Sequence, residues 1–371
     1  MNSPYLGGAE RSIVFQSILA KQYTLSRFII PSLSQNDYLE LEEFIRSVIP
    51  NIKIEVINYP SRLFSVSRSS GLLAMVFGLL QLPVFLVKLK KLVKSSDVLW
   101  CNGNKIGLPL YLSGRLFSRK EKLIWHFRDY PSQNRIYRKI WSMFGDEDFS
   151  LCLIGNSVDV HNKIKETVAC PNVVQTVYNP VGKSFKKRSI KQIKVLGSMS
   201  MLAPWKGVHE IILLSKIFER ELIDLGIERI NIYGDQIYQT DGDHSNYPKD
   251  IKELAQDSKL IHFLGKRSAE EIFNSIDLLI HSSIKKEPFG RIITEAFSAN
   301  IPVISTGLGG AGELVIHKET GMVYNPCHFY ELFSCVKSLV TNNNLLDKVI
   351  LQAELKKNEV EKLAREQILK I

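Results

Sequence analysis

Two carboxylates lie eight positions apart around a Pro-Phe-Gly-Arg turn, at Glu287 and Glu295. Pro288 ends any preceding helix or strand, and Gly290 permits a close approach of the backbone. Residues 291–300 then predict a helix, whose free N–H groups can hold an anion. We therefore expect the two glutamates to flank a ligand that carries a phosphate and sugar-like hydroxyls.

Two further features near this segment suit an anionic ligand. Lys206 lies in a Pro-Trp-Lys-Gly turn, between a predicted strand over residues 193–197 and a predicted helix over residues 209–219. A lysine at a helix start is a point charge suited to a diphosphate, although an ordinary surface lysine is the alternative. The glycines at 307, 309, 310 and 312 predict a loop whose amides can face a phosphate.

Other candidate residues follow predicted strands or begin a helix. Gly7 and Gly8 open a helix near the start of the chain, where an ordinary turn is the alternative. His126 and Arg128 follow a predicted strand, at the edge where strand ends present ligand contacts, and a merely structural histidine is the alternative. Lys266 follows a strand predicted over residues 260–264, where a nucleobase can rest against the backbone.

Short apolar runs alternate with helical patterns along most of the chain, which predicts an α/β fold with parallel sheets covered by helices on both faces. Strands are predicted over residues 52–58, 97–101, 122–125, 151–154, 193–197, 230–233, 260–264, 278–281 and 302–305. Helices are predicted over residues 8–21, 38–48, 209–219, 269–276, 291–300 and 329–340.

A chain of 371 residues is long enough for two packed domains with a cleft between them. The polar and basic stretch over residues 181–192 marks the seam, because a Pro-Val-Gly turn precedes a new series of strands. We therefore expect one domain over residues 1–182, a second over residues 190–345 and a helical tail over residues 346–371.

Composition bears on the cellular compartment and on the kind of surface or substrate that the protein contacts. Five cysteines without a CxxC pair indicate neither a zinc site nor a disulfide framework, and no secretory leader is recognisable, so we expect a reducing cytoplasm. Residues 1–189 hold 26 Lys and Arg against 14 Asp and Glu, whereas residues 190–371 hold 22 against 24. The basic first half favours an anionic surface or substrate, with an ordinary solvated surface as the alternative.

An uncharged stretch over residues 69–87 precedes a lysine-rich run. Pro83 and Gln81 interrupt it, which argues against a membrane span. Its continuation places Phe85, Leu86, Leu89, Leu92 and Val93 on one helical face and Lys88, Lys90, Lys91 and Lys94 on the other. That pattern suits a helix on an anionic membrane surface, and it equally suits a core helix with a solvated basic edge.

The motifs GGAE, APWKG, EPFGR with its paired glutamates, and the GGAGE loop occur in an order and spacing that resembles the family-four glycosyltransferases of the GT-B fold. The resemblance covers nearly the whole chain, and its second-half motifs are the more specific. It implies two Rossmann-like domains whose parallel sheets face a central cleft. It also implies a retaining, metal-independent transfer of a sugar from a UDP- or GDP-linked donor, with no other cofactor.

The resemblance assigns roles to matching residues. Glu287 would contact hydroxyls of the donor sugar, Glu295 the ribose, and Lys206 the diphosphate, while His126 would approach from the acceptor side. The implied catalytic residues are His126, Lys206 and Glu287. The implied donor-binding residues are Gly8, Ser198, Lys206, Lys266, Glu287, Pro288, Phe289, Gly290, Arg291 and Glu295. Same-face transfer, in which the leaving diphosphate helps to deprotonate the acceptor hydroxyl, is the implied route to retention.

Two departures from the family pattern stand out. Ser198 occupies the position of a usual arginine, for which Arg291 can compensate. The chain also begins almost at the GGAE motif, whereas the family has a complete first strand before it, so we expect either a shortened start or a first sheet that lacks an edge, which bears on activity.

The leading hypothesis is a transferase of cell-surface polysaccharide synthesis that acts on a glycan or lipid-linked acceptor at the inner face of the cell membrane. A nucleotide-sugar epimerase with the same fold and a catalytically silent nucleotide- or glycan-binding scaffold are the alternatives. A nicotinamide-dependent dehydrogenase is disfavoured, because no GxGxxG follows a first strand. Nucleic-acid binding would explain the charge but none of the motifs.

Overall fold

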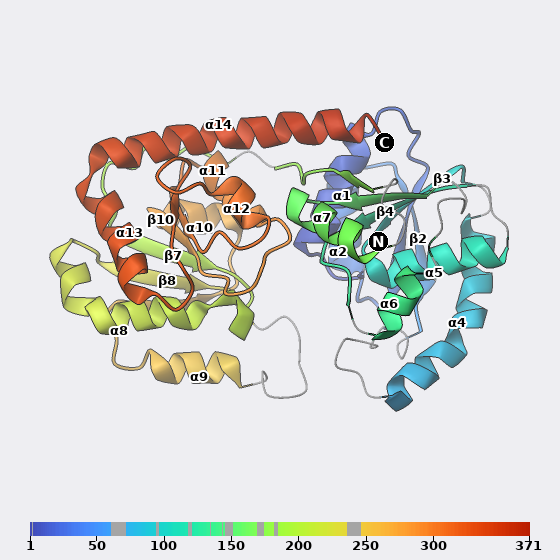
Figure 1. The fold of residues 1–371 in the computed structure, drawn as a ribbon, viewed down its shortest axis with the longest axis horizontal. Coiled ribbons are helices and arrows are strands. Elements are labelled where there is room, and N and C mark those ends of the chain that lie inside the picture. Colours follow the sequence, from blue (N-terminus) through green and yellow to red (C-terminus); the bar gives the residue numbers. More distant parts are fainter. Residues whose placement is uncertain are drawn as a thin grey trace. The chain divides into compact units, whose positions relative to one another are not determined.

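The computed structural model describes residues 1, 3–60, 72–93, 96–117, 121–133, 135–142, 144, 151–168, 174–181, 185–235 and 246–371, without the side chains of residues 72–79 and 135–137. The chain divides into two compact units. Unit 1 is Met1–Gly182 with Leu363–Ile371, and unit 2 is Lys183–Lys362. Each unit contains parallel β-sheet and α-helices (Figure 1), so the predicted α/β class is confirmed.

Unit 1 contains two parallel sheets, one of strands β1-β2 and the other of strands β3-β4-β5-β6. Its strands are β1 Arg27–Ser32, β2 Lys53–Asn58, β3 Val98–Asn102, β4 Lys122–Phe127, β5 Leu151–Gly155 and β6 Val174–Thr176. Its helices are α1 Gly8–Leu19, α2 Leu39–Val48, α4 Leu72–Val93, α5 Asn104–Leu116, α6 Arg135–Trp141 and α7 Val158–Thr167. The prediction of a shortened first strand stays a prediction.

Unit 2 contains one six-stranded parallel sheet in the order β12-β11-β10-β7-β8-β9. Its strands are β7 Val195–Met199, β8 Arg229–Tyr233, β9 Ile261–Gly265, β10 Leu278–His281, β11 Val303–Ser305 and β12 Met322–Val323. Its helices include α8 Val208–Asp224, α9 Tyr247–Leu254, α10 Ala269–Ser275, α11 Arg291–Ser298, α12 Ala311–Leu314 and α13 Phe329–Thr341. The last helix, α14 Asn343–Ile368, begins in unit 2, and its final residues belong to unit 1.

Both faces of the larger sheet in unit 1 are buried, as a parallel sheet with crossover helices requires. Along β4, Leu123, Trp125 and Phe127 join one apolar cluster, whereas Ile124 joins another. The alternation follows from the twofold periodicity of a strand. The same alternation places the side chain of His126 on the same face of the sheet as Ile124, which is the face that the second cluster covers.

The predicted strands all occur, with ends that differ by at most two residues. Three strands were missed. Strand β1 contains Pro31, which argues against a strand on sequence grounds, and β6 and β12 are too short for any periodicity to appear.

The apolar face of helix α4 was predicted to contact either the core or a membrane surface. It is buried in the core of unit 1, at Phe85, Leu86, Leu89 and Val93. The apolar face of α4 is therefore a core face, and the membrane-surface interpretation of that face was wrong.

No helix among the described residues is long and apolar enough to cross a membrane.

Gly207 allows the loop before α8 to pack against the residues that follow β10. Gly207 has a left-handed backbone (φ 67°) between the short 3₁₀ helix Pro204–Lys206 and α8. A Cβ atom on Gly207 would lie 2.0 Å from the carbonyl oxygen of Ser282. The loop can therefore pack on the end of β10 only when this residue has no side chain.

We predict that Gly207→Ala lowers the free energy of unfolding by about 3 kcal/mol or more, because the left-handed backbone and the backbone clash act together. Gly226→Ala is the matched control, since Gly226 is also left-handed (φ 87°) but its Cβ would meet no atom closer than 3.9 Å. It should cost only about 1 kcal/mol. Urea denaturation of both variants measures the difference, and equal losses would contradict the proposed clash.

Candidate functional site

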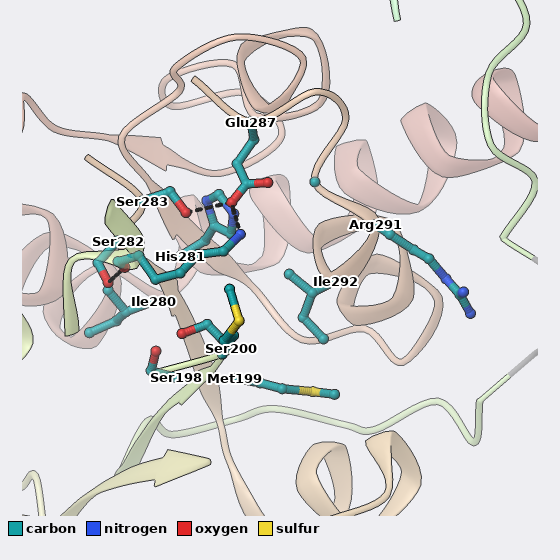
Figure 2. A pocket seen from close by; sticks show the side chains of 13 residues that line it. Ser198, Met199, Ser200, Ile280, His281, Ser282, Ser283, Glu287, Arg291 and Ile292 are labelled. Carbon is teal, nitrogen blue, oxygen red and sulfur yellow. Dashed lines mark hydrogen bonds and ion pairs between the residues drawn. The ribbon is translucent and has the colours of Figure 1, made fainter. Parts of the chain in front are cut away.

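A cavity of about 280 Å³ lies within unit 2, at the carboxyl ends of β7 and β10 and beside the start of α11 (Figure 2). The carboxyl ends of parallel strands are where α/β sheets usually bind ligands. The cavity is lined by Ser198, Met199, Ser200, Met201, Lys206, Ile280, His281, Ser282, Ser283, Glu287, Gly290, Arg291 and Ile292.

The carboxylate of Glu287 is the centre of the polar contacts in this cavity. Its Oε1 atom pairs with the ammonium group of Lys206 and accepts a hydrogen bond from the Ser283 hydroxyl at 2.6 Å. The Nε2 atom of His281 lies 3.7 Å from the same oxygen. Figure 2 shows the Ser283 and His281 side chains turned toward Glu287 from the end of β10.

These contacts control the ionisation of Glu287. Burial alone would raise its pKa, but the polar ring of His281 nearby and the positive charge of Lys206 hold the pKa of this carboxyl well below its ordinary value. Glu287 therefore stays ionised at neutral pH, and the cavity contains a fixed negative charge beside a fixed positive one.

The segment after β10 also holds the loop that carries Lys206. The hydroxyl of Ser282 donates to the carbonyl oxygen of Lys206 at 2.9 Å, and the amide of Ile284 donates to that of Trp205 at 3.0 Å. Because these two bonds hold the carbonyl oxygens of Trp205 and Lys206, the side chain of Lys206 extends toward Glu287 from a fixed backbone.

The glycine-rich loop holds Glu287 by its backbone. The amide of Gly310 donates to the carbonyl oxygen of Glu287 at 2.7 Å, and the amide of Glu287 donates to that of Leu308 at 3.1 Å. A Cβ atom on Gly310 would lie 2.4 Å from the carbonyl oxygen of Pro288, so the two segments touch through their backbones.

This packing corrects the prediction that the loop amides face a phosphate. The amides of Gly307, Gly310 and Gly312 donate to Ser305 Oγ, Glu287 O and Gly309 O, respectively. A short, side-chain-free loop is required here because two backbone segments pack against each other. The loop therefore supports the carboxylate, and three of its amides are already used.

Helix α11 begins at the turn that the sequence predicted. Gly290 is its N-cap and has a left-handed backbone (φ 86°), which explains the glycine at this position. Phe289 is buried and Pro288 is partly buried. Arg291 forms an ion pair of 2.7 Å with Glu295, which is buried one turn along the helix.

The structure thus brings five predicted site residues into one cavity, namely Ser198, Lys206, Glu287, Gly290 and Arg291. Glu295 contacts this set through its ion pair with Arg291. Pro288 and Phe289 lie between Glu287 and Gly290 in the sequence. Lys266 is exposed, follows the edge strand β9 and is not among the residues that line the cavity.

The other two predicted residues, Gly8 and His126, belong to unit 1. Gly8 is the first residue of α1. His126 is fully buried, and neither ring nitrogen has a hydrogen-bond partner among the described residues. Burial, followed by the charge of Arg128, lowers the pKa of His126 well below its ordinary value, so the ring is neutral.

Sequence reasoning missed His281, Ser282 and Ser283 as site residues. Their signal was present, since they end a predicted strand and lie just before Glu287. Short polar side chains are common after strands, however. Only the folded structure shows that Ser282 bonds the Lys206 loop, that Ser283 bonds Glu287 and that the His281 ring lies beside the same carboxylate.

In the part of the chain that the structure describes, no three His, Cys, Asp or Glu side chains come together as a metal site. The cavity instead offers a lysine, an ionised carboxylate, serine hydroxyls and a helix start. Such a set can bind a ligand that has both an anionic group and several hydroxyls.

Comparison with known proteins agrees with this chemistry. Residues 182–359 match the family described as glycosyl transferases group 1. The putative glycosyltransferase YtcC of Bacillus subtilis is 25% identical over 173 residues, which are 45% of this chain and 42% of YtcC. CapM of Staphylococcus aureus, a capsular polysaccharide biosynthesis glycosyltransferase, is 22% identical over 155 residues, 42% of this chain and 39% of CapM. These matches span about two fifths of the length of each relative.

Among solved structures, Anabaena Alr3699/HepE in complex with UDP and glucose superposes with a TM-score of 0.75 at 20% identity, covering 100% of this chain and 96% of that protein. The same protein has also been solved with UDP-glucose. At this identity the likeness establishes the fold, which is the GT-B fold of two Rossmann-like domains.

The low pKa of Glu287 predicts how acid acts on the protein. The unfolded chain takes up the proton near the ordinary value of 4.5, whereas the folded chain takes it up only at lower pH. The stabilisation is therefore complete above that value and is lost as pH falls through the folded pKa. Glu287→Gln lacks this contribution, so the urea midpoints of wild type and variant should converge as pH falls from 6 toward 3. Curves that stay parallel would contradict the assignment.

Proposed function

Because residues 182–359 belong to the glycosyl transferases group 1 and the chain has the GT-B fold, we propose that this protein is a retaining glycosyltransferase. It transfers a sugar from a nucleotide-sugar donor to a glycan or lipid-linked acceptor in cell-surface polysaccharide synthesis. The observation that carries the proposal is the Lys206–Glu287 pair in a cavity beside the start of α11. The UDP and glucose bound by HepE favour a UDP-linked donor over a GDP-linked one.

The donor would be held by two adjacent opposite charges, where its diphosphate joins its sugar. Lys206 neutralises the diphosphate with the help of the N-terminus of α11, where Gly290 lets the backbone approach closely. Glu287, which stays ionised, accepts hydrogen bonds from hydroxyls of the donor sugar. Glu295 contacts the ribose, with Arg291 beside it.

The transfer would proceed on one face of the sugar. The bond between the anomeric carbon and the diphosphate oxygen breaks, and the acceptor oxygen bonds to the same face of that carbon. The acceptor proton passes to the departing diphosphate oxygen. Negative charge grows on the diphosphate, so a fixed ammonium group at Lys206 lowers the barrier without reorganisation.

His126 keeps a proposed role on the acceptor side. Because its ring is neutral, it would act by hydrogen bonding to a sugar or phosphate oxygen and not by its charge. The catalytic step needs no metal in this proposal, so transfer should persist in the presence of a chelator.

We predict that Lys206→Ala lowers kcat for transfer about 100-fold or more, the usual loss when one transition-state donor is removed. Glu295→Ala should also lower turnover strongly. Lys216→Ala, which removes an exposed lysine on α8 of the same unit, is the control and should leave turnover unchanged. Wild-type turnover of Lys206→Ala would refute the assigned site.

A panel of UDP- and GDP-linked sugars, with and without EDTA, tests the reaction class. We expect release of UDP from one sugar and a product that keeps the anomeric configuration of the donor, as read by NMR. Conversion of the free nucleotide sugar into its epimer would indicate the epimerase alternative. A thermal shift without any turnover would indicate a silent binding scaffold.

We also propose that unit 1 contacts an anionic membrane surface at the inner face of the cell. The support lies on the outward side of α4, opposite its core face. Leu80, Val84 and Val87 are exposed there, with Leu80 at 68% and Val84 at 63%, and Lys88 and Lys91 are exposed beside them. Apolar and basic side chains along one helical stripe suit an anionic lipid interface.

Co-sedimentation with vesicles tests this contact. Wild type should bind vesicles that contain phosphatidylglycerol and should be released by salt, whereas Leu80→Asp/Val84→Asp should bind at least about tenfold less. Leu351→Asp/Leu355→Asp is the matched control, since it changes an exposed apolar pair on α14. Equal binding by both double variants would refute the α4 surface.

A further inference from the structure

We propose that His281 is a positioning residue that orients the carboxylate of Glu287 by the polarity of its ring N–H, and that hydrogen bonds through Ser305 to the glycine-rich loop hold the ring in place. The inference rests on the proposed function, because it assigns His281 to the donor-binding carboxylate. The connection runs from Gly307 through Ser305 and His281 to Glu287, and it lies wholly within unit 2.

The two middle members of this connection are neighbours in the sheet. His281 ends β10 and Ser305 ends β11, and the two are paired in the parallel register. The Nδ1 atom of His281 lies 3.1 Å from the Ser305 hydroxyl. His281 is 8% exposed and Ser305 is fully buried, so solvent does not compete for this contact.

The direction of the hydrogen bonds follows from the donors. The amide of Gly307 can only donate, and it donates to the Ser305 oxygen at 3.1 Å. In the proposed tautomer the Ser305 hydroxyl donates its own hydrogen to His281 Nδ1, which is its partner among the described side chains. A neutral imidazole that accepts at Nδ1 carries its hydrogen on Nε2. The N–H of His281 therefore faces the Oε1 atom of Glu287.

The distance of 3.7 Å between Nε2 and Oε1 exceeds that of a direct hydrogen bond. His281 thus orients the carboxylate by the polarity of its N–H, while Ser283 and Lys206 make the direct bonds to the same oxygen. Three groups from two loops and a strand end converge on Oε1, which fixes the plane of the carboxylate. Figure 2 shows the second oxygen turned away from Ser283 and His281.

A purely structural role would not need this arrangement. The end of β10 could be filled equally by a leucine of similar volume, which would leave Oε1 with Ser283 and Lys206 but without the third group. Misplacement of a substrate-positioning group by a fraction of an ångström can cost one to two orders of magnitude in rate. The position of His281 therefore matters for turnover more than for stability.

Substitution of His281 in the full-length protein tests the proposal. His281→Leu should lower kcat about tenfold with a donor KM changed less than about threefold. His281→Gln, which restores an N–H donor of similar reach, should recover most of the loss. His262→Leu, on the exposed face of β9, is the control and should behave as wild type. Wild-type kcat in His281→Leu would overturn the proposal.

A double-mutant cycle tests the connection itself. Ser305→Ala removes the group that sets the tautomer of His281, so it should also lower kcat. The pair Ser305→Ala/His281→Leu should be no slower than His281→Leu alone, because both changes break one connection. Fully additive losses would show that the two residues act separately and would overturn the connection.

A readout without turnover separates this inference from the proposed function. Loss of the N–H at position 281 should make Glu287 easier to protonate in the folded protein, so its folded pKa moves toward the unfolded value of 4.5 and the acid-induced fall of the urea midpoint below about pH 5 should be smaller in His281→Leu. His281→Gln should follow wild type. An unchanged profile in His281→Leu overturns the inference, whereas a shifted profile in a protein that turns over no nucleotide sugar would overturn only the proposed function.

Discussion

The ion pair between Lys206 and Glu287 is the interaction on which the candidate site depends. A partly buried pair of charges loses hydration, and it is favourable only where further hydrogen bonds satisfy it. Ser283 supplies such a hydrogen bond to Glu287, the polar ring of His281 lies 3.7 Å from the same oxygen, and the pKa of the carboxyl is held low in consequence. The cavity therefore holds two opposite charges ready for a ligand, with little rearrangement needed.

The fold of unit 2 provides this support through the carboxyl end of β10. Three successive residues there serve different partners, since His281 faces Glu287, Ser282 holds the backbone of Lys206, and Ser283 bonds the Glu287 carboxylate. On the other side, the glycine-rich loop after β11 bonds the backbone of Glu287. Parallel strands place these loops at one edge of the sheet, so residues about 80 to 100 positions apart meet in one cavity.

Glycine has a different task at each position where the site requires it. Gly207 lets the Lys206 loop contact the backbone of Ser282, Gly290 opens α11 with a left-handed turn, and Gly310 admits the carbonyl oxygen of Pro288. Gly207 and Gly310 thus serve the packing of one backbone segment on another, whereas Gly290 serves the turn itself. The GGAGE motif had suggested phosphate binding, but its contacts show that it is a support for the segment that carries Glu287.

The sequence by itself determined the α/β class, nearly all long strands, the turn at Gly290 and the candidacy of Lys206 and Glu287, because these follow from local periodicity, backbone preference and charge. It could not determine which side chains bond Glu287, since His281, Ser283 and Lys206 approach it from separate segments. It also left open whether the apolar face of α4 packs on the core or on a membrane surface, because a core helix and a surface helix share one pattern. Tertiary structure decided both points, since packing places distant segments in contact and shows what covers an apolar face.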